Sequence, residues 1–211
     1  MSLWDRVVVA TPPAAPVVNL LSLADIRGHA AIDDATSDAE LTRYLAEAVA
    51  MIDGPQGIGY ALLSQTWRLS LDCFPTQAYG LYVQPAGIEI RLPGAPVKSI
   101  VSVTYVAGDG TTTTLAADQY TVDLDRTPAL LLPAYGLAWP AARIQPGSVK
   151  ITYTLGEATA ATVNPRLISA VMLMVSYRDK FREAAGVADT KPIAMGVDSL
   201  LHEFNQLAVT G

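Results

Sequence analysis

The chain has 211 residues, of which 51% are hydrophobic and 16% are charged, and its net charge is −6. This length and apolar content suffice for a packed core and predict one domain, or one domain with an extension. The negative charge argues against tight non-specific binding of nucleic acid, which requires clustered Lys and Arg. The low charged fraction fits either an alanine-rich chain or a surface that other subunits cover, because obligate interfaces resemble cores.

The single cysteine, Cys73, excludes an internal disulfide and a multi-cysteine zinc site, and it favours a reducing compartment. No stretch reaches the roughly 18 continuous apolar residues of a membrane-spanning helix. The N-terminus also lacks the plan of a signal peptide. We therefore expect no association with a membrane.

The N-terminal part predicts an extended segment followed by two helices. Prolines exclude a helix in residues 4–21, and Ser22 is a predicted N-cap for a short helix that follows. Ser37–Glu40 has the pattern of a capping box and opens a longer helix, which Gly54-Pro55 ends. One face of this longer helix is apolar and carries Leu41, Leu45, Ala48, Val49 and Ile52.

Residues 61–155 change to the alternating pattern of β-strands. In the first of these strands Trp67, Leu69 and Leu71 alternate with Arg68, Ser70 and Asp72. A Gly-Asp-Gly turn at 108–110 joins two strands as a hairpin. The strands are predicted near residues 65–72, 88–91, 100–106, 111–115, 120–124, 129–132 and 148–155, which makes a small antiparallel β-unit of about six or seven strands.

The chain then returns to helix. Asn164 is a predicted N-cap, and Pro165 takes the first helical position. The helix over 166–183 is apolar almost all round, which is typical of a central core helix or of one between subunits. A Gly- and Ala-rich loop is expected over 184–196, and a last amphipathic helix over 198–207.

These elements predict an α+β fold, in which a helical bundle of two N-terminal and two C-terminal helices carries an inserted small antiparallel β-unit. We expect an extended N-terminal arm at 1–21, a helical connector domain formed by 22–60 and 164–211, and an inserted β-domain at 61–163.

Little in the sequence points to catalysis. His29 and His202 lack the spacing of a metal-binding pair, and each is interpreted as an ordinary helical residue. Cys73 best fits a small buried hydrophobe, because no base can be assigned to it. The glycine-rich segment 54–59 ends a helix and lacks the Lys-Ser/Thr of a phosphate loop. We therefore expect no cofactor, no metal and no enzymatic activity.

One basic cluster stands out near the end of the long apolar helix, at Arg178, Lys180 and Arg182. Such residues complement the carboxyl end of a helix dipole, which is the favoured interpretation. The alternative is a few phosphate contacts repeated around a ring of subunits. Trp67 and Trp139 fit either a core or an interface.

Several short pieces occur in an order that covers most of the chain. They are TPPAAPVVNLLSLADIRGH, DDATSDAELTRYLAEAVAMID, the segment Gln65–Pro75, the segment Ile90–Ile100, the Gly-Asp-Gly turn, Trp139-Pro140, VKITYTLG, and Asn164–Leu167 opening an apolar helix. In this order the chain resembles the head–tail connector, or adaptor, proteins of long-tailed bacteriophages and of phage-derived gene transfer agents. It departs from their pattern at Gly57–Tyr60 and at Asp179–Phe181.

The resemblance implies a structural role in the virion, at the head–tail junction of a particle made in the bacterial cytoplasm. Such proteins form a dodecameric ring beneath the portal protein, extend the DNA channel, and offer a platform to the next connector or tail protein. Double-stranded DNA passes without sequence-specific binding. The implied partner interface is the C-terminal helix with Leu200, Leu201, Phe204 and Leu207, and the candidate DNA-channel contacts are Arg178, Lys180 and Arg182.

Two other classes of function stay open. A carbohydrate- or protein-binding module would line a groove of the β-unit with Tyr79, Tyr82 and Trp139. A small cysteine hydrolase would use Cys73 as its nucleophile.

Overall fold

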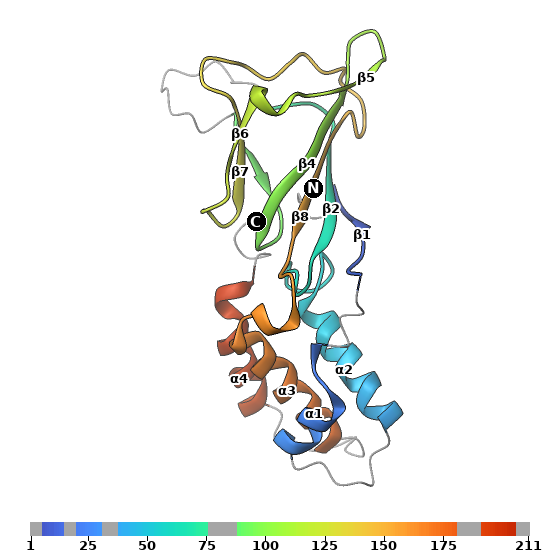
Figure 1. The fold of residues 1–211 in the computed structure, drawn as a ribbon, viewed down its shortest axis with the longest axis vertical. Coiled ribbons are helices and arrows are strands. Elements are labelled where there is room, and N and C mark those ends of the chain that lie inside the picture. The colour runs from blue at the N-terminus through green and yellow to red at the C-terminus, as the bar shows by residue number, and fades with distance from the viewer. Residues whose placement is uncertain (1–5, 15–19, 31–37, 76–87, 181–190, 206–211) are drawn as a thin grey trace. The chain divides into compact units, whose positions relative to one another are not determined.

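The computed structural model describes residues 6–14, 20–30, 38–75, 88–180 and 191–205 (Figure 1). Within these ranges the chain divides into two compact units. The β-unit comprises residues 6–12 and 65–156, and the helical unit comprises residues 13–64 and 157–205, apart from the gaps just given. The short segments 61–64 and 157–163, expected in the inserted β-domain, cluster with the helical unit.

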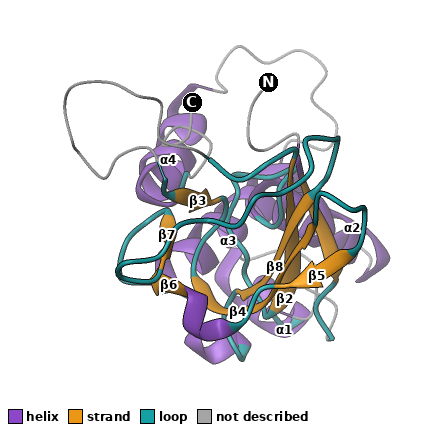
Figure 2. Ribbon diagram, turned by 90° about the horizontal axis from the view of Figure 1, so that it is seen from above, coloured by secondary structure: helices purple, strands orange, loops and turns teal. Residues whose placement is uncertain are grey.

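The β-unit holds two antiparallel sheets, whose strands are visible in Figures 1 and 2. The larger sheet has five strands in the order β1 (Val7–Thr11), β2 (Gln65–Leu71), β8 (Val149–Leu155), β4 (Val97–Val106) and β5 (Thr112–Thr114). The smaller sheet has three strands in the order β3 (Ile90–Leu92), β7 (Ala129–Pro133) and β6 (Tyr120–Asp123). A one-turn helix, η3 (Ala117–Gln119), precedes β6.

The core of the β-unit follows from the alternation of its strands. Trp67 and Leu69 of β2 are fully buried, as are Ile151 and Tyr153 of β8. The register pairs Trp67 with Tyr153 and Leu69 with Ile151, so that large side chains meet on one face. The buried Tyr153 hydroxyl donates to the carbonyl of Pro93, which follows β3, at 2.7 Å.

The helical unit contains α1 (Leu23–Ala30), α2 (Asp38–Ile52), α3 (Pro165–Lys180) and α4 (Lys191–Leu201), with one-turn helices η4 (Ala160–Thr162) and η5 (His202–Phe204). The predicted caps are confirmed where the structure describes them. The Ser22 hydroxyl accepts from the Asp25 amide at 3.1 Å, and the Asn164 side chain accepts from the Arg166 amide at 3.0 Å. Ser37, the expected cap of α2, lies outside the described residues.

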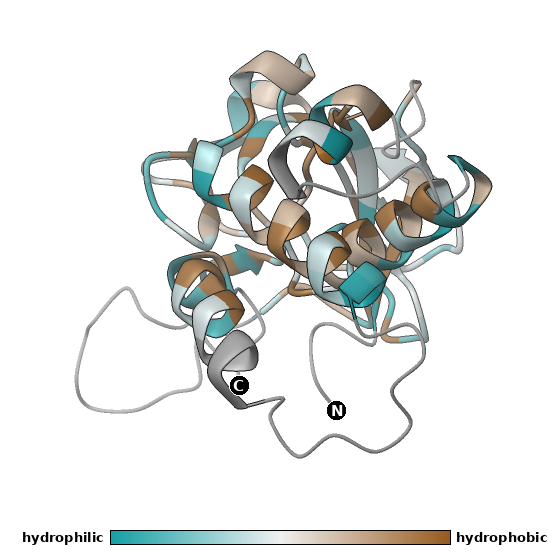
Figure 3. Ribbon diagram, turned by 90° about the horizontal axis from the view of Figure 1, so that it is seen from below, coloured by the Kyte–Doolittle hydropathy of each residue, from teal (hydrophilic) through white to brown (hydrophobic). Residues whose placement is uncertain are grey.

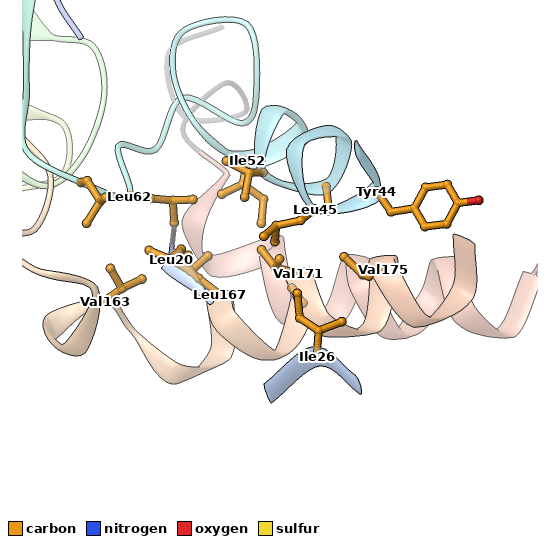
Figure 4. Close-up of a cluster of buried hydrophobic side chains, with 14 of the residues drawn as sticks. Leu20, Ile26, Tyr44, Leu45, Ile52, Leu62, Val163, Leu167, Val171 and Val175 are labelled. Atoms are coloured by element: carbon orange, nitrogen blue, oxygen red, sulfur yellow. The ribbon is translucent and has the colours of Figure 1, made fainter. Parts of the chain in front are cut away.

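The core of the helical unit lies between α1, α2 and α3 (Figure 4). In Figure 4, Ile26 of α1, Leu45 of α2 and Val171 of α3 point toward one another, and none of them is more than 1% exposed. Figure 3 shows hydrophobic and hydrophilic residues alternating along the helices. This pattern is the expected one for helices that bury one stripe and leave another in solvent.

The α+β class is confirmed, since helices and antiparallel sheets are both present. Within the helical unit α3 contacts α1, α2 and α4, and a groove opens between α2 and α4. The helices thus gather on α3, and the tighter packing of a four-helix bundle stays a prediction.

Two elements differ from the sequence prediction. Residues 7–11, placed in an extended arm, form β1 and pair with β2. Residues 191–196, expected in a loop, belong to α4, which ends at Leu201 instead of 207. Gly196 suggested a loop, but it lies inside the helix, and its backbone passes close to the Leu173 side chain of α3.

Candidate interaction surfaces

Cys73, His29 and His202 are the candidates for chemistry that the sequence offers. No group of three or more His, Cys, Asp or Glu among the described residues could hold a metal ion. Cys73 is exposed and carries a free thiol, so its expected burial is wrong: it follows the end of β2 in a bend. Both histidines belong to the helical unit, whereas Cys73 belongs to the β-unit. The features that remain are surfaces for contact with other molecules.

The first surface is an apolar groove of the helical unit, with a volume of about 730 Å³, which we call the helical groove. Its walls come from α2, α3 and α4, which contribute Tyr44, Ala48, Met51, Met174, Tyr177, Val197 and Leu201. Met51 is 63% exposed, which is high for a methionine on a packed helix. Flexible, polarisable methionine side chains suit a surface that adapts to a partner.

An ion pair stands at the rim of the helical groove. Nε of Arg178 lies 3.1 Å from Oε2 of Glu47, joining α3 to α2, and both side chains are substantially exposed. Arg178 was a candidate channel contact, and here its charge already faces a carboxylate. Lys180 is exposed at the end of α3, and Arg182 lies outside the described residues. Of this basic cluster the structure thus describes two members, and their contact with DNA stays a prediction.

The expected partner interface is partly engaged within the helical unit. Leu200, Leu201 and Phe204 are half-buried and pack against the helical core. The Phe204 ring meets the ring of Tyr60 edge-to-face, with 5.5 Å between centroids. Burial raises the pKa of the Tyr60 hydroxyl, and the nearby charge of Glu157 adds to the increase. Leu207 lies outside the described residues.

A second surface belongs to the β-unit and surrounds the connection from β7 to β8. It forms a concavity of about 630 Å³ next to Cys73, and its lining is mostly apolar. Tyr135 and Ile144 of this connection are almost fully exposed. Trp139 is held in place, because its ring stacks on Phe74 at 4.9 Å and its indole N–H donates to the carbonyl of Ile88 at 2.6 Å. One face of the Trp139 ring and its N–H edge are therefore engaged within the β-unit, and the side chain is half-buried.

A third surface, the outer face of the five-stranded sheet, was missed by the sequence analysis. The residues of β2 that face away from its core are Thr66, Arg68 and Ser70, and those of β8 are Lys150, Thr152 and Thr154. On β4 the matching residues are Ser99, Ser102 and Thr104. We call these residues the hydroxyl face. The alternation of TWRLSL and VKITYTL contained this signal, but only the strand order places the polar halves side by side.

Comparison with solved structures identifies the fold. One match is a chain of a structure described as the neck of an empty gene transfer agent (GTA) particle computed with C6 symmetry, with 24% identity, 95% of each chain covered and a TM-score of 0.68. Another comes from the virion of a native GTA particle, with 22% identity, 92% of this chain and 94% of that chain covered, and a TM-score of 0.66.

A third match comes from the neck of a native GTA particle computed with C12 symmetry, with 24% identity, 90% of this chain and 93% of that chain covered, and a TM-score of 0.59. No protein-family model matches the sequence, and no curated protein matches it. The likeness to GTA particle chains that the sequence resemblance predicted is therefore confirmed at the level of the fold.

Proposed function

We propose that this protein is a structural component of a phage-like particle, namely a head–tail adaptor. It forms a ring under the portal protein, extends the DNA channel, and provides the platform for the next connector or tail protein. The observation that carries the proposal is the fold, which is shared over nearly the whole chain with chains of GTA necks computed with C6 and C12 symmetry. In such a ring each copy contacts its neighbours through two different surfaces.

The surfaces described above support this role better than an enzymatic one. The helical groove and the apolar concavity of the β-unit are of the kind that subunit contacts cover. Among the described helices, none is long and apolar enough to cross a membrane. We place the protein in the virion, at the head–tail junction, and we propose that the four helices act together as its connector domain.

We further propose that the end of the helical unit around Leu200, Leu201 and Phe204 contacts the portal. These side chains keep part of their apolar surface exposed while packing on their own core. The segment that contains Leu207 continues this apolar pattern in the sequence.

Co-sedimentation of the purified full chain with the portal protein of the same genome tests both proposals. The wild-type protein should sediment with the portal, and Leu200→Gln should weaken this association several-fold. Leu124→Gln, a matched change at an exposed leucine of the β-unit outside both apolar surfaces, should leave it unchanged. Thermal unfolding of both variants shows whether they fold. An adaptor role is refuted if the wild type never associates with the portal and particles lacking the protein still join tails.

A further inference from the structure

The hydroxyl face carries positive charge on a protein that is negative overall. Its two cations, Arg68 and Lys150, are exposed, and the other members are Ser and Thr. No Asp or Glu occurs in β2, β8 or β4. The whole chain has 20 acidic and 14 basic residues. A face of three adjacent strands without a carboxylate is therefore a local exception to the charge of the molecule.

The charges of this face are not neutralised by nearby acids within the described residues. Neither Arg68 nor Lys150 forms one of the ion pairs found there. The nearest carboxylate along the chain, Asp72, follows the end of β2 and is already paired with Arg6 at 2.9 Å. Asp72 also accepts a hydrogen bond from the Gly147 amide at 3.1 Å. Both cations are thus available to an external anion.

The strand register brings the two cations close together. Arg68 lies opposite Thr152, and Lys150 lies opposite Ser70, so the two are diagonal neighbours on adjacent strands. Such neighbours are about 7–8 Å apart. Hydroxyls lie on the β4 side of the pair, where Thr152 and Lys150 of β8 are opposite Ser102 and Thr104. On the β1 side, Arg68 lies opposite the exposed Val8. The result is a group of hydroxyls beside two positive charges, bordered by β1.

This chemistry fits phosphate better than a protein partner. Protein interfaces are enriched in aromatic residues, Met and Arg and depleted in Lys and Ser. The hydroxyl face contains no aromatic residue and no Met, and Arg68 is its only residue of an enriched type. Phosphate oxygens are bound mainly by Arg, Lys, Ser and Thr side chains, without reading the sequence of bases. We infer that the hydroxyl face contacts the phosphate backbone of duplex DNA.

The inference rests on the proposed function, because an adaptor ring surrounds the DNA that enters and leaves the particle. Two cations in each subunit hold a duplex only weakly, and a ring repeats them with its symmetry. Weak contacts distributed in this way keep the duplex centred and still let it slide, since each contact exchanges with counterions. Arg178, engaged with Glu47, contributes less to this role than Arg68 and Lys150.

An NMR titration tests the inference on the full-length, ¹⁵N-labelled protein with a short DNA duplex at low ionic strength. Amide shifts should change in β2, β8 and β4. In the double variant Arg68→Gln/Lys150→Gln these changes should be lost or need about tenfold more DNA. The slope of log affinity against log salt should fall by about 1.8, because each phosphate contact contributes about 0.9. Arg68→Lys should keep binding, because it keeps the charge.

The matched control is Arg91→Gln/Arg126→Gln, which removes the same charge from cations that already pair with Glu89 and Asp123. It should bind DNA within twofold of wild type. The inference is overturned if no sheet amide shifts at the highest DNA concentration, if the shifts map to α3, or if the double variant titrates like wild type. Equal binding of polyglutamate would also overturn it, in favour of an acidic protein. Portal association is measured separately, so failure here leaves the adaptor proposal standing.

Discussion

Gly94 shows at the scale of one residue how closely the β-unit is packed. It lies between β3 and β4 with φ of +93°, a backbone conformation that favours glycine. A Cβ added there would lie 2.4 Å from Cζ3 of the buried Trp67 ring and 2.9 Å from a methyl group of Leu155. The glycine is therefore required both by its backbone angle and by the lack of space.

Gly94→Ala should lower the free energy of unfolding by about 2–4 kcal/mol, because overpacking and positive φ add. Gly136→Ala is the matched control: its φ is +78°, and an added Cβ meets nothing within 4 Å. That change should cost only about 1 kcal/mol. Chemical denaturation of both variants measures the difference. If both variants lose the same free energy of unfolding, the close approach to Trp67 adds no cost of its own.

Tyr153 links the core of the β-unit to alkaline stability. Its hydroxyl is buried, burial raises its pKa far above the usual value near 10, and its hydrogen bond reaches the Pro93 carbonyl. Above pH about 10 the unfolded chain releases this proton, whereas the folded chain keeps it. The contribution of Tyr153 to the free energy of unfolding is therefore fully present below pH about 10. Above that pH it declines by about 1.4 kcal/mol for each pH unit.

Tyr153→Phe should cost about 1–2 kcal/mol at neutral pH, because the buried Pro93 carbonyl loses its partner. The variant should also lose less stability than wild type between neutral and strongly alkaline pH. Denaturant midpoints across this range provide the measurement, with Tyr135→Phe, at a fully exposed site, as the control. Parallel pH profiles for wild type and Tyr153→Phe would contradict the assignment.

At the scale of elements, the start of α3 depends on a single side-chain cap. Asn164 accepts from the Arg166 amide at 3.0 Å, and its own carbonyl accepts from the Leu167 amide at 3.0 Å. Asn164→Ala should lower the free energy of unfolding by about 1 kcal/mol, whereas Asn164→Asp should preserve it, since both Asn and Asp cap well. Thermal unfolding of the two variants measures the loss of stability in each. A loss of the same size in both would mean that the cap is not what Asn164 provides.

Most elements were predictable from local signals. The alternation in TWRLSL and VKITYTL placed β2 and β8, and the Asn164-Pro165 signal placed the start of α3. Strand β1 and the first part of α4 could not be predicted from local signals, because the elements that they pack against are distant in sequence. β1 becomes a strand by pairing with β2, more than fifty residues later. Gly196 is tolerated in α4, which packs against α3.

The candidate surfaces were less predictable than the elements. Leu200 and Phe204 could be selected as apolar positions, but their partial burial depends on Tyr60 and on α3. Arg178 was selected by charge alone, and its pairing with Glu47 requires α2 and α3 to be adjacent. Arg68 and Lys150 meet only because β2 and β8, 84 positions apart at their first residues (149 − 65), are neighbours in the sheet.

At the scale of the whole molecule, two compact units share one chain whose charged fraction is only 16%. The helical unit presents an apolar groove, and the β-unit presents an apolar concavity on its own surface. If neighbouring copies cover these apolar surfaces, the low charged fraction is explained, because obligate interfaces are more hydrophobic than other protein surface. Such contacts belong to the adaptor proposal, and the likeness to GTA neck chains itself concerns the fold.

The adaptor proposal is tested most directly by electron cryo-microscopy of the full chain bound to the portal protein of the same genome. We predict a ring of 12 copies coaxial with the portal, in keeping with the C12 symmetry of the native GTA neck, with the channel continuous through both rings. A portal without this density, or with the protein bound away from the channel axis, would contradict the proposal.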